Sequence, residues 1–440
     1  GVGALNGNTT ANYNTAVGGS ALAANTTGGN NTAVGAYALD ANTTADNNTA
    51  VGYQAMTSNT TGNSNAAFGY TSLRDNTTAS DNTGFGYLTL QSNSTGASNT
   101  AVGAAALADN TSASNNTAVG RKALRLNTTG ANNTALGMSA LDANTTASEN
   151  TAVGSGSLGA NTTGTTNVAV GYAALAANTT ASENTSIGSH SMQVNTTGAS
   201  ITAVGYKALN ANTTGSNNTA VGSNALDANT TGTQNTAVGR HALSAVTTTG
   251  DNTAIGYYAG SSITGQENTA VGNQAMIGAT TGNQNTAVGC YVLDAALTGS
   301  SNTGVGYNAL TSNTSGAANV AIGREALEAN TTADHNTAVG AIALHSNTTG
   351  THNQAVGNYA LQNCTTGSYN IGIGYNTLGS VTTENNNIAI GDAALESCTA
   401  ENNTAVGFNA LQSNTTGHSN TAMGYFACKD NTTTDNNTGI

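Results

Sequence analysis

The chain contains no proline and no tryptophan, and only 7% of its 440 residues are charged, whereas about a quarter of the residues in ordinary globular proteins are. With 8 lysines and arginines in total, the sequence has no basic stripe that could neutralise phosphates, which argues against nucleic acid or an anionic membrane surface as a partner. No apolar run approaches the roughly 20 residues needed to span a bilayer. Four cysteines make no disulfide framework.

What the sequence does contain is a repeat. One glycine closes each N-T-A-V-G block, in a series that starts at Gly1, Gly18 and Gly35 and ends at Gly407 and Gly424. Every step is 17 residues except two of 16, so 26 coils of 17 residues, less two deletions, make 440. Residues 1–440 are therefore predicted to form one continuous array without separate domains.

The two ends of the sequence are in phase with each other. Residues 437–440 supply the first four positions of a coil and Gly1 supplies the fifth. We therefore expect either an excerpt from a longer array or subunits that stack head to tail along a fibre axis.

Coil positions are numbered 1 to 17 here along the consensus N-T-A-V-G-x-x-A-L-x-x-N-T-T-G-x-x. Seventeen residues are too few for two helices and a turn, and the segments lack a helical apolar period. Glycines at positions 5 and 15 are typical of corners, since glycine tolerates positive φ. Short strands between such corners at a fixed period predict an all-β fold, a parallel β-solenoid or β-roll.

The substitutions at each position suggest which side chains face inward. Positions 4 and 9 are apolar in nearly every coil, and position 2 is usually Thr but becomes apolar at Val168 and Ile371, with Gln354 as a larger polar exception. At position 12, Asn is replaced only by apolar residues, which predicts an inward Asn ladder with amides bonded from coil to coil. The predicted core ladders are Val17, Val34 and Val51, then Leu22, Leu39 and Met56, then Asn25, Asn42 and Asn59.

Position 3 is always Ala, Gly or Ser, as in Ala16, Ala33, Ala50, Ala67 and Gly84. Alternation with inward positions 2 and 4 turns it outward, where a free surface would carry larger polar residues. We therefore expect a strip for lateral packing against a neighbouring chain. The alternative is a narrow solenoid whose opposite wall presses on these residues.

No local departure from the repeat gathers titratable groups in a cleft, so we predict neither an enzyme nor a cofactor or metal site. His335 and His352 share position 17 of successive coils, a geometry that two solvated turn residues explain. Cys364 and Cys398 lie two coils apart, too far for a disulfide.

Two surface features bear on ligands and modification. Tyr53, Tyr70 and Tyr87 share position 6 of successive coils and are expected to stack for rigidity, with contact to sugar rings as the alternative. Asparagines in N-x-S/T sequons at position 17 are candidate glycosylation sites: Asn30, Asn47, Asn115 and Asn132.

The blocks Asn31-Thr32-Ala33-Val34-Gly35 and Tyr53-Gln54-Ala55-Met56 resemble the N-T-A-V-G-Y-x-A-L arrays of phage-like tail-fibre and bacterial surface-fibre proteins. They resemble more distantly the β-roll head of trimeric autotransporter adhesins. The resemblance implies a parallel β-roll, often trimeric, that projects from a cell or virion surface and serves attachment.

These observations predict a structural extracellular fibre, an adhesin-like shaft that associates with itself along its axis and laterally. Surface polysaccharide is a possible further partner. The alternative is an ice- or polysaccharide-binding solenoid that uses a rank of outward threonines at position 13, such as Thr26, Thr43, Thr60 and Thr77.

Overall fold

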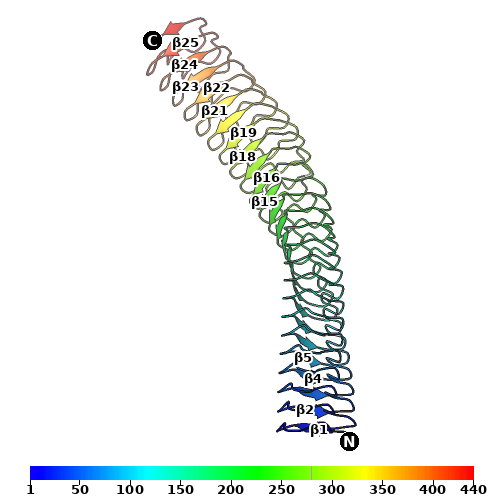
Figure 1. Ribbon diagram of the computed structural model, residues 1–440. Coiled ribbons are helices and arrows are strands. Elements are labelled where there is room, and N and C mark those ends of the chain that lie inside the picture. The colour runs from blue at the N-terminus through cyan, green and yellow to red at the C-terminus, as the bar shows by residue number, and fades with distance from the viewer. Residues whose placement is uncertain (279) are drawn as a thin grey trace. The chain divides into compact units, whose positions relative to one another are not determined.

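The computed structural model describes residues 1–278 and 280–440. The chain forms a parallel β-solenoid in two units, Gly1–Ala220 and Val221–Ile440. Within each unit the backbone winds through successive coils, and each coil places one short strand beside the strand of the coil before it (Figure 1). No helix occurs among the described residues.

Each strand covers coil positions 2 to 4, the T-A-V segment. In the first unit the strands are β1 (Thr15–Val17), β2 (Thr32–Val34), β3 (Thr49–Val51), β4 (Ala66–Phe68), β5 (Thr83–Phe85), β6 (Thr100–Val102), β7 (Thr117–Val119), β8 (Thr134–Leu136), β9 (Thr151–Val153), β10 (Val168–Val170), β11 (Thr185–Ile187) and β12 (Thr202–Val204). The boundary between the units falls within β13 (Thr219–Val221). In the second unit the strands are β14 (Thr236–Val238), β15 (Thr253–Ile255), β16 (Thr269–Val271), β17 (Thr286–Val288), β18 (Thr303–Val305), β19 (Val320–Ile322), β20 (Thr337–Val339), β21 (Gln354–Val356), β22 (Ile371–Ile373), β23 (Ile388–Ile390), β24 (Thr404–Val406), β25 (Thr421–Met423) and β26 (Thr438–Gly439).

The strands pair in parallel with like positions opposite each other. Ala33 of β2 lies opposite Ala50 of β3, for example. The two 16-residue coils keep this register, because Thr253 pairs with Thr269 and Ile388 pairs with Thr404. Both deletions are therefore absorbed in the turn that follows position 12, and the ladder of strands continues across them.

The glycine at position 5 is required by the backbone. Gly52 has a φ of 142°, and a Cβ built on it would lie 2.2 Å from the carbonyl oxygen of Gly69 in the next coil. This prediction of a corner at position 5 is confirmed. Position 15 differs: Gly28 is buried and does not have positive φ, so its small size reflects interior packing.

The core of each coil is formed by positions 1, 3, 8, 9, 12 and 15. Leu22, Leu39 and Met56 at position 9 are fully buried, and so are Asn25, Asn42 and Asn59 at position 12. Apolar replacements at position 12 are buried in the same way, namely Val246, Ile263, Cys364, Val381 and Cys398.

One stretch of the second unit departs from this assignment. Ala296 is exposed, and the neighbouring Leu297 is fully buried. Thr280 in the preceding coil is also fully buried, while Ala279 lies outside the described residues. The buried residue of this turn is therefore at position 13 instead of position 12, because burying Leu297 removes far more apolar surface from water than burying an alanine does.

The predicted orientation of the strands was wrong. Val17 is 57% exposed and Val34 is 36% exposed, and Val51 is half-buried, so position 4 points outward. The predicted inward position 2 is half-buried on the same outer face, as at Val168 and Ile371. The physical reason is the alternation of side chains along a strand, since an inward Asn at position 1 forces position 3 inward and positions 2 and 4 outward.

The predicted lateral strip at position 3 is consequently part of the core. Ala33, Ala50 and Ala67 are fully buried, Gly84 is buried, and Ala16 in the first coil is half-buried. These residues are small because the solenoid is narrow and the opposite wall, at positions 8 and 9, presses on them.

The pairing of small and large residues across the interior supports this explanation. A Cβ on Gly84 would lie 2.5 Å from Oγ of Ser72 and 3.0 Å from Oγ1 of Thr89, both at position 8. Gly304 faces Val292, and Gly372 faces Thr377, in the same manner. At these three places glycine at position 3 lies beside a position-8 side chain larger than the usual Ala.

Candidate functional surface

The interior carries the predicted Asn ladder at position 12. Asn42 Nδ2 donates to Oδ1 of Asn25 at 2.8 Å and to the carbonyl oxygen of Ala45 at 3.1 Å. Equivalent amide–amide bonds follow through Asn59, Asn76 and successive coils of the first unit. Each buried amide therefore links its coil to the preceding one.

A second Asn ladder occupies position 1. Asn31 Oδ1 accepts the backbone N–H of Asn48 at 2.8 Å, and Asn31 Nδ2 donates to the carbonyl oxygen of Ala45, also at 2.8 Å. The Ala45 carbonyl oxygen thus receives one proton from each ladder. Sequence reasoning missed this ladder, although the near-invariance of Asn immediately before the strand was a readable signal.

The threonines at position 13 form a third axial series. Thr26 Oγ1 donates to the carbonyl oxygen of Thr43 at 3.0 Å, and Thr43 Oγ1 donates to that of Thr60 at 3.2 Å. Thr60 and Thr77 continue the series. These hydroxyl protons are used within the solenoid, which weakens the hypothesis that position 13 presents a free hydroxyl rank.

The outward face of the strands is an uncharged stripe in which a row of mostly threonines runs beside a row of apolar side chains. It consists of positions 2 and 4, and no Asp, Glu, Lys or Arg occurs at either position in any coil. Phe85 is 50% exposed, and Val102, Val119 and Leu136 are more than a third exposed. We call this face the Thr–Val strip. The sequence analysis had assigned these two positions to the interior of the solenoid.

Aromatic rings line the edge of the Thr–Val strip in the first unit. The rings of Tyr53 and Tyr70 stack with centroids 5.5 Å apart, and Tyr70 and Tyr87 repeat this distance. Phe68 and Phe85, at position 4, stack at 4.4 Å. The predicted tyrosine ladder is confirmed. Because the Tyr70 ring is stacked on both sides, its faces are not open to a sugar.

The candidate glycosylation sites lie on the surface. Asn30, Asn47, Asn115 and Asn132 are all exposed, with φ between 57° and 61°. The sequons at position 12 from Asn25 to Asn414 are different, since their asparagines are buried, whereas Asn8 is exposed and Asn431 is half-buried. In the coils between Asn25 and Asn414, position 17 is therefore where a modifying enzyme could reach an asparagine, and whether any is modified stays a prediction.

The remaining candidates are a pair of stacked histidines and two buried cysteines. His335 and His352 stack with centroids 5.0 Å apart, and His352 stacks on Tyr369 at 4.9 Å. Cys364 and Cys398 are buried free thiols, and burial raises the pKa of Cys364 to about 12.

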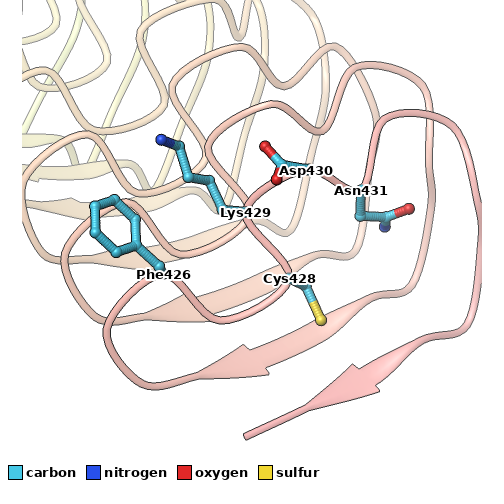
Figure 2. A pocket seen from close by; sticks show the side chains of 5 residues that line it. All are labelled: Phe426, Cys428, Lys429, Asp430 and Asn431. Atoms are coloured by element: carbon cyan, nitrogen blue, oxygen red, sulfur yellow. The ribbon is translucent and has the colours of Figure 1, made fainter.

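A pocket of about 580 Å³ is lined by Phe426, Cys428, Lys429, Asp430 and Asn431 (Figure 2). In the preceding coils, the residues that correspond to Cys428 and Asn431 are Leu411 and Asn414, which are fully buried. The Lys429 amine lies 4.7 Å from the centre of the Phe426 ring. The pocket is thus the open face of a coil rather than a cleft built by several elements.

No protein-family model matches the chain, and no curated protein does. None of the described residues belongs to a helix that could cross a membrane.

Proposed function

We propose that this chain is a structural fibre protein, an adhesin-like shaft exposed on the outside of a cell or virion. The observation that carries the proposal is the position-1 ladder. Its bond from a backbone N–H to the preceding Asn Oδ1 recurs at every step from Asn14 to Ile201 and from Asn235 to Asn437.

Such a network supports a mechanical role because each coil is bonded to its neighbours in the same way. In a solenoid the stability is approximately a sum of coil terms and nearest-neighbour terms. Buried amides that bond across coils add about 1 kcal/mol per hydrogen bond. The resemblance to surface-fibre arrays and the exposed sequons at position 17 agree with an extracellular location.

Lateral self-association belongs to the same proposal, with the Thr–Val strip as the contact surface. Contiguous exposed apolar surface marks interaction sites, here the row at position 4, and the repeat of the strip matches that of a second copy. Because the strip is uncharged, two copies can approach without desolvating a charge.

The test places charges on the strip. Val102→Asp combined with Val119→Asp should prevent side-by-side association, as measured by analytical ultracentrifugation and negative-stain electron microscopy. Ser112→Asp, an exposed change at position 14, is the matched control and should leave association intact. Equal behaviour of all three proteins, or a wild-type chain that never associates, would contradict lateral packing on this face.

An ice- or polysaccharide-binding solenoid is the second candidate. The observation that favours it is the in-register rank of Thr32, Thr49 and their equivalents on the outer sheet face, which replaces the rank at position 13. A thermal-hysteresis assay tests the ice version, and absence of activity removes it.

A further inference from the structure

We propose that Glu325, Glu328 and His345 form a binding site for a divalent transition-metal ion, with Zn²⁺ as the best match. One ligand atom from each residue lies within 4.8 Å of the other two. Glu325 and Glu328 occupy positions 7 and 10 of one coil, and His345 occupies position 10 of the next. The site therefore spans two successive coils of the second unit.

The backbone fixes the position of the three residues. The N–H of Ala329 donates to the carbonyl oxygen of His345 at 3.0 Å, and the N–H of Glu325 donates to that of Tyr307 at 2.9 Å. The side chains are partly exposed, at 22% for Glu325, 28% for Glu328 and 38% for His345. Little conformational freedom of the backbone is left to lose when a metal binds.

The contact between His345 and Glu328 points to a cation. His345 Nδ1 lies 3.2 Å from Glu328 Oε2, within ion-pair distance, and the His345 side chain is 38% exposed. The Nδ1 atom itself is covered and makes no hydrogen bond of good geometry. At this distance an imidazole nitrogen and a carboxylate oxygen are joined either by a proton on Nδ1 or by a metal ion, and Nδ1 offers its lone pair to the metal when the ring proton is on Nε2. Ligand atoms of a tetrahedral zinc site stand about 3.4 Å apart, given metal–ligand distances of about 2.1 Å.

The donor set selects the class of metal. One imidazole and two carboxylates suit zinc and neighbouring transition metals, whereas Ca²⁺ and Mg²⁺ prefer all-oxygen ligands. Arg324 forms an ion pair with Glu325, with its guanidinium nitrogen 2.7 Å from Oε1. That pairing leaves Oε2 of Glu325 for the metal and orients the carboxylate.

The chain contains a metal-free counterpart of this arrangement. Glu396 and Gln412 also occupy position 10 of successive coils, and Gln412 Nε2 donates to Glu396 Oε2 at 2.8 Å. Position 7 of that coil is Ala393, so no third ligand is present. Replacing His345 by Gln would therefore reproduce a pair that the fold already accommodates.

The experiment titrates the metal-free full chain with Zn²⁺ by calorimetry and with Co²⁺ by visible absorption. We expect one equivalent to bind, with the intense d–d bands of tetrahedral Co²⁺. His345→Gln and Glu325→Gln should each weaken binding at least about 10-fold, while His352→Gln, a change at another corner, should not.

Two results would overturn the proposal. One is a wild-type chain that binds Zn²⁺ no better than His345→Gln. The other is unchanged binding in Glu325→Gln, since that variant keeps the Glu328–His345 pair and removes only the third ligand. Hydrogen exchange in peptides of residues 319–352 verifies that each variant keeps its coils, so a lost metal is not mistaken for a lost fold.

Discussion

The two Asn ladders should differ in how well they tolerate an apolar replacement. We consider Asn110→Val at position 12 and Asn116→Val at position 1. Both asparagines are buried. The side chain of Asn110 takes part in three hydrogen bonds that valine cannot make. The side chain of Asn116 also takes part in three, while its own backbone N–H is unaffected by the substitution. The difference between the variants lies in what each substitution leaves unpaired.

Asn110→Val leaves the side-chain oxygen of Asn93 without a donor. The carbonyl of Ala113 keeps its bond from Asn99 Nδ2 at 2.8 Å. The fold already contains such a case, because Oδ1 of Asn347 is buried without a partner where Cys364 occupies position 12 of the next coil.

Asn116→Val instead leaves the buried backbone N–H of Asn133 without its acceptor, Asn116 Oδ1 at 2.9 Å. Buried backbone N–H groups are almost never unpaired in native proteins, and leaving one unpaired costs about 1 to 3 kcal/mol. We expect Asn116→Val to destabilise its coil by about that much more than Asn110→Val does.

Native-state hydrogen exchange by mass spectrometry is the appropriate assay, because a long repeat array does not unfold in a single two-state step. The amide of Asn133 should exchange about 5- to 150-fold faster in Asn116→Val than in Asn110→Val, from 1.4 kcal/mol per tenfold. Equal exchange in the two variants would refute the assignment of distinct roles to the ladders.

Three further predictions follow from single residues. Gly52→Ala should lower the stability of its coil by about 3 kcal/mol or more, because the added methyl group combines backbone strain with a backbone clash. Gly19→Ala is the control, since no atom lies within 4 Å of a Cβ built on Gly19, and it should leave the denaturation midpoint unchanged. Thr166→Asn should raise the stability of the fold against chemical denaturation by about 1 kcal/mol, because a β-branched residue is strained at the φ of 56° found at position 166. A denaturation midpoint below that of the wild-type chain would contradict this prediction. Burial raises the pKa of Cys364 from 9.0 to about 12, so the protonated thiol contributes its full stability below pH 9 and that contribution is lost as the pH rises toward 12. The variant Cys364→Val should not lose stability over this pH range for that reason. Identical alkaline stability profiles for the wild-type chain and the variant would contradict this prediction.

We could predict the period and the parallel register from the repeat itself. We could also predict that positions 9 and 12 face inward, because every replacement at these positions is a residue that can be buried. Leu22 is exchanged for Met56, and Asn25 for Val246, each buried in the same way. Such substitutions report the environment of a side chain directly. Position 17 could be read as a surface turn for a similar reason, since it varies freely among polar residues.

Hydrophobicity alone could not predict which side chains of each strand point into the core. A strand of three residues allows two phases, and choosing the one that buries Val34 rather than Ala33 was reasonable but wrong. The phase is set by Asn31, whose amide must reach the carbonyl of Ala45 across the coil. The pairing of Gly84 with Ser72 and Thr89 across the interior was present in the sequence and would have indicated the correct phase.

The site of Glu325, Glu328 and His345 illustrates a different limit. The three residues belong to two coils, and no motif of fixed spacing links them. Writing the coils beneath one another places Glu328 directly beside His345 at position 10, and this comparison could have identified the pair. The approach of Glu325 from position 7 depends on the turn geometry, which the sequence does not specify.

Electron cryo-microscopy of the assembled protein tests the central claim most directly, namely that the chain is a shaft whose Thr–Val strip contacts neighbouring copies. We predict solenoids packed side by side, with Val102 and Val119 at the contact and the alanines of position 3 enclosed within each chain. Solenoids that remain isolated at high concentration, or that touch through the corners at position 17 with the Thr–Val strip facing solvent, would contradict the account.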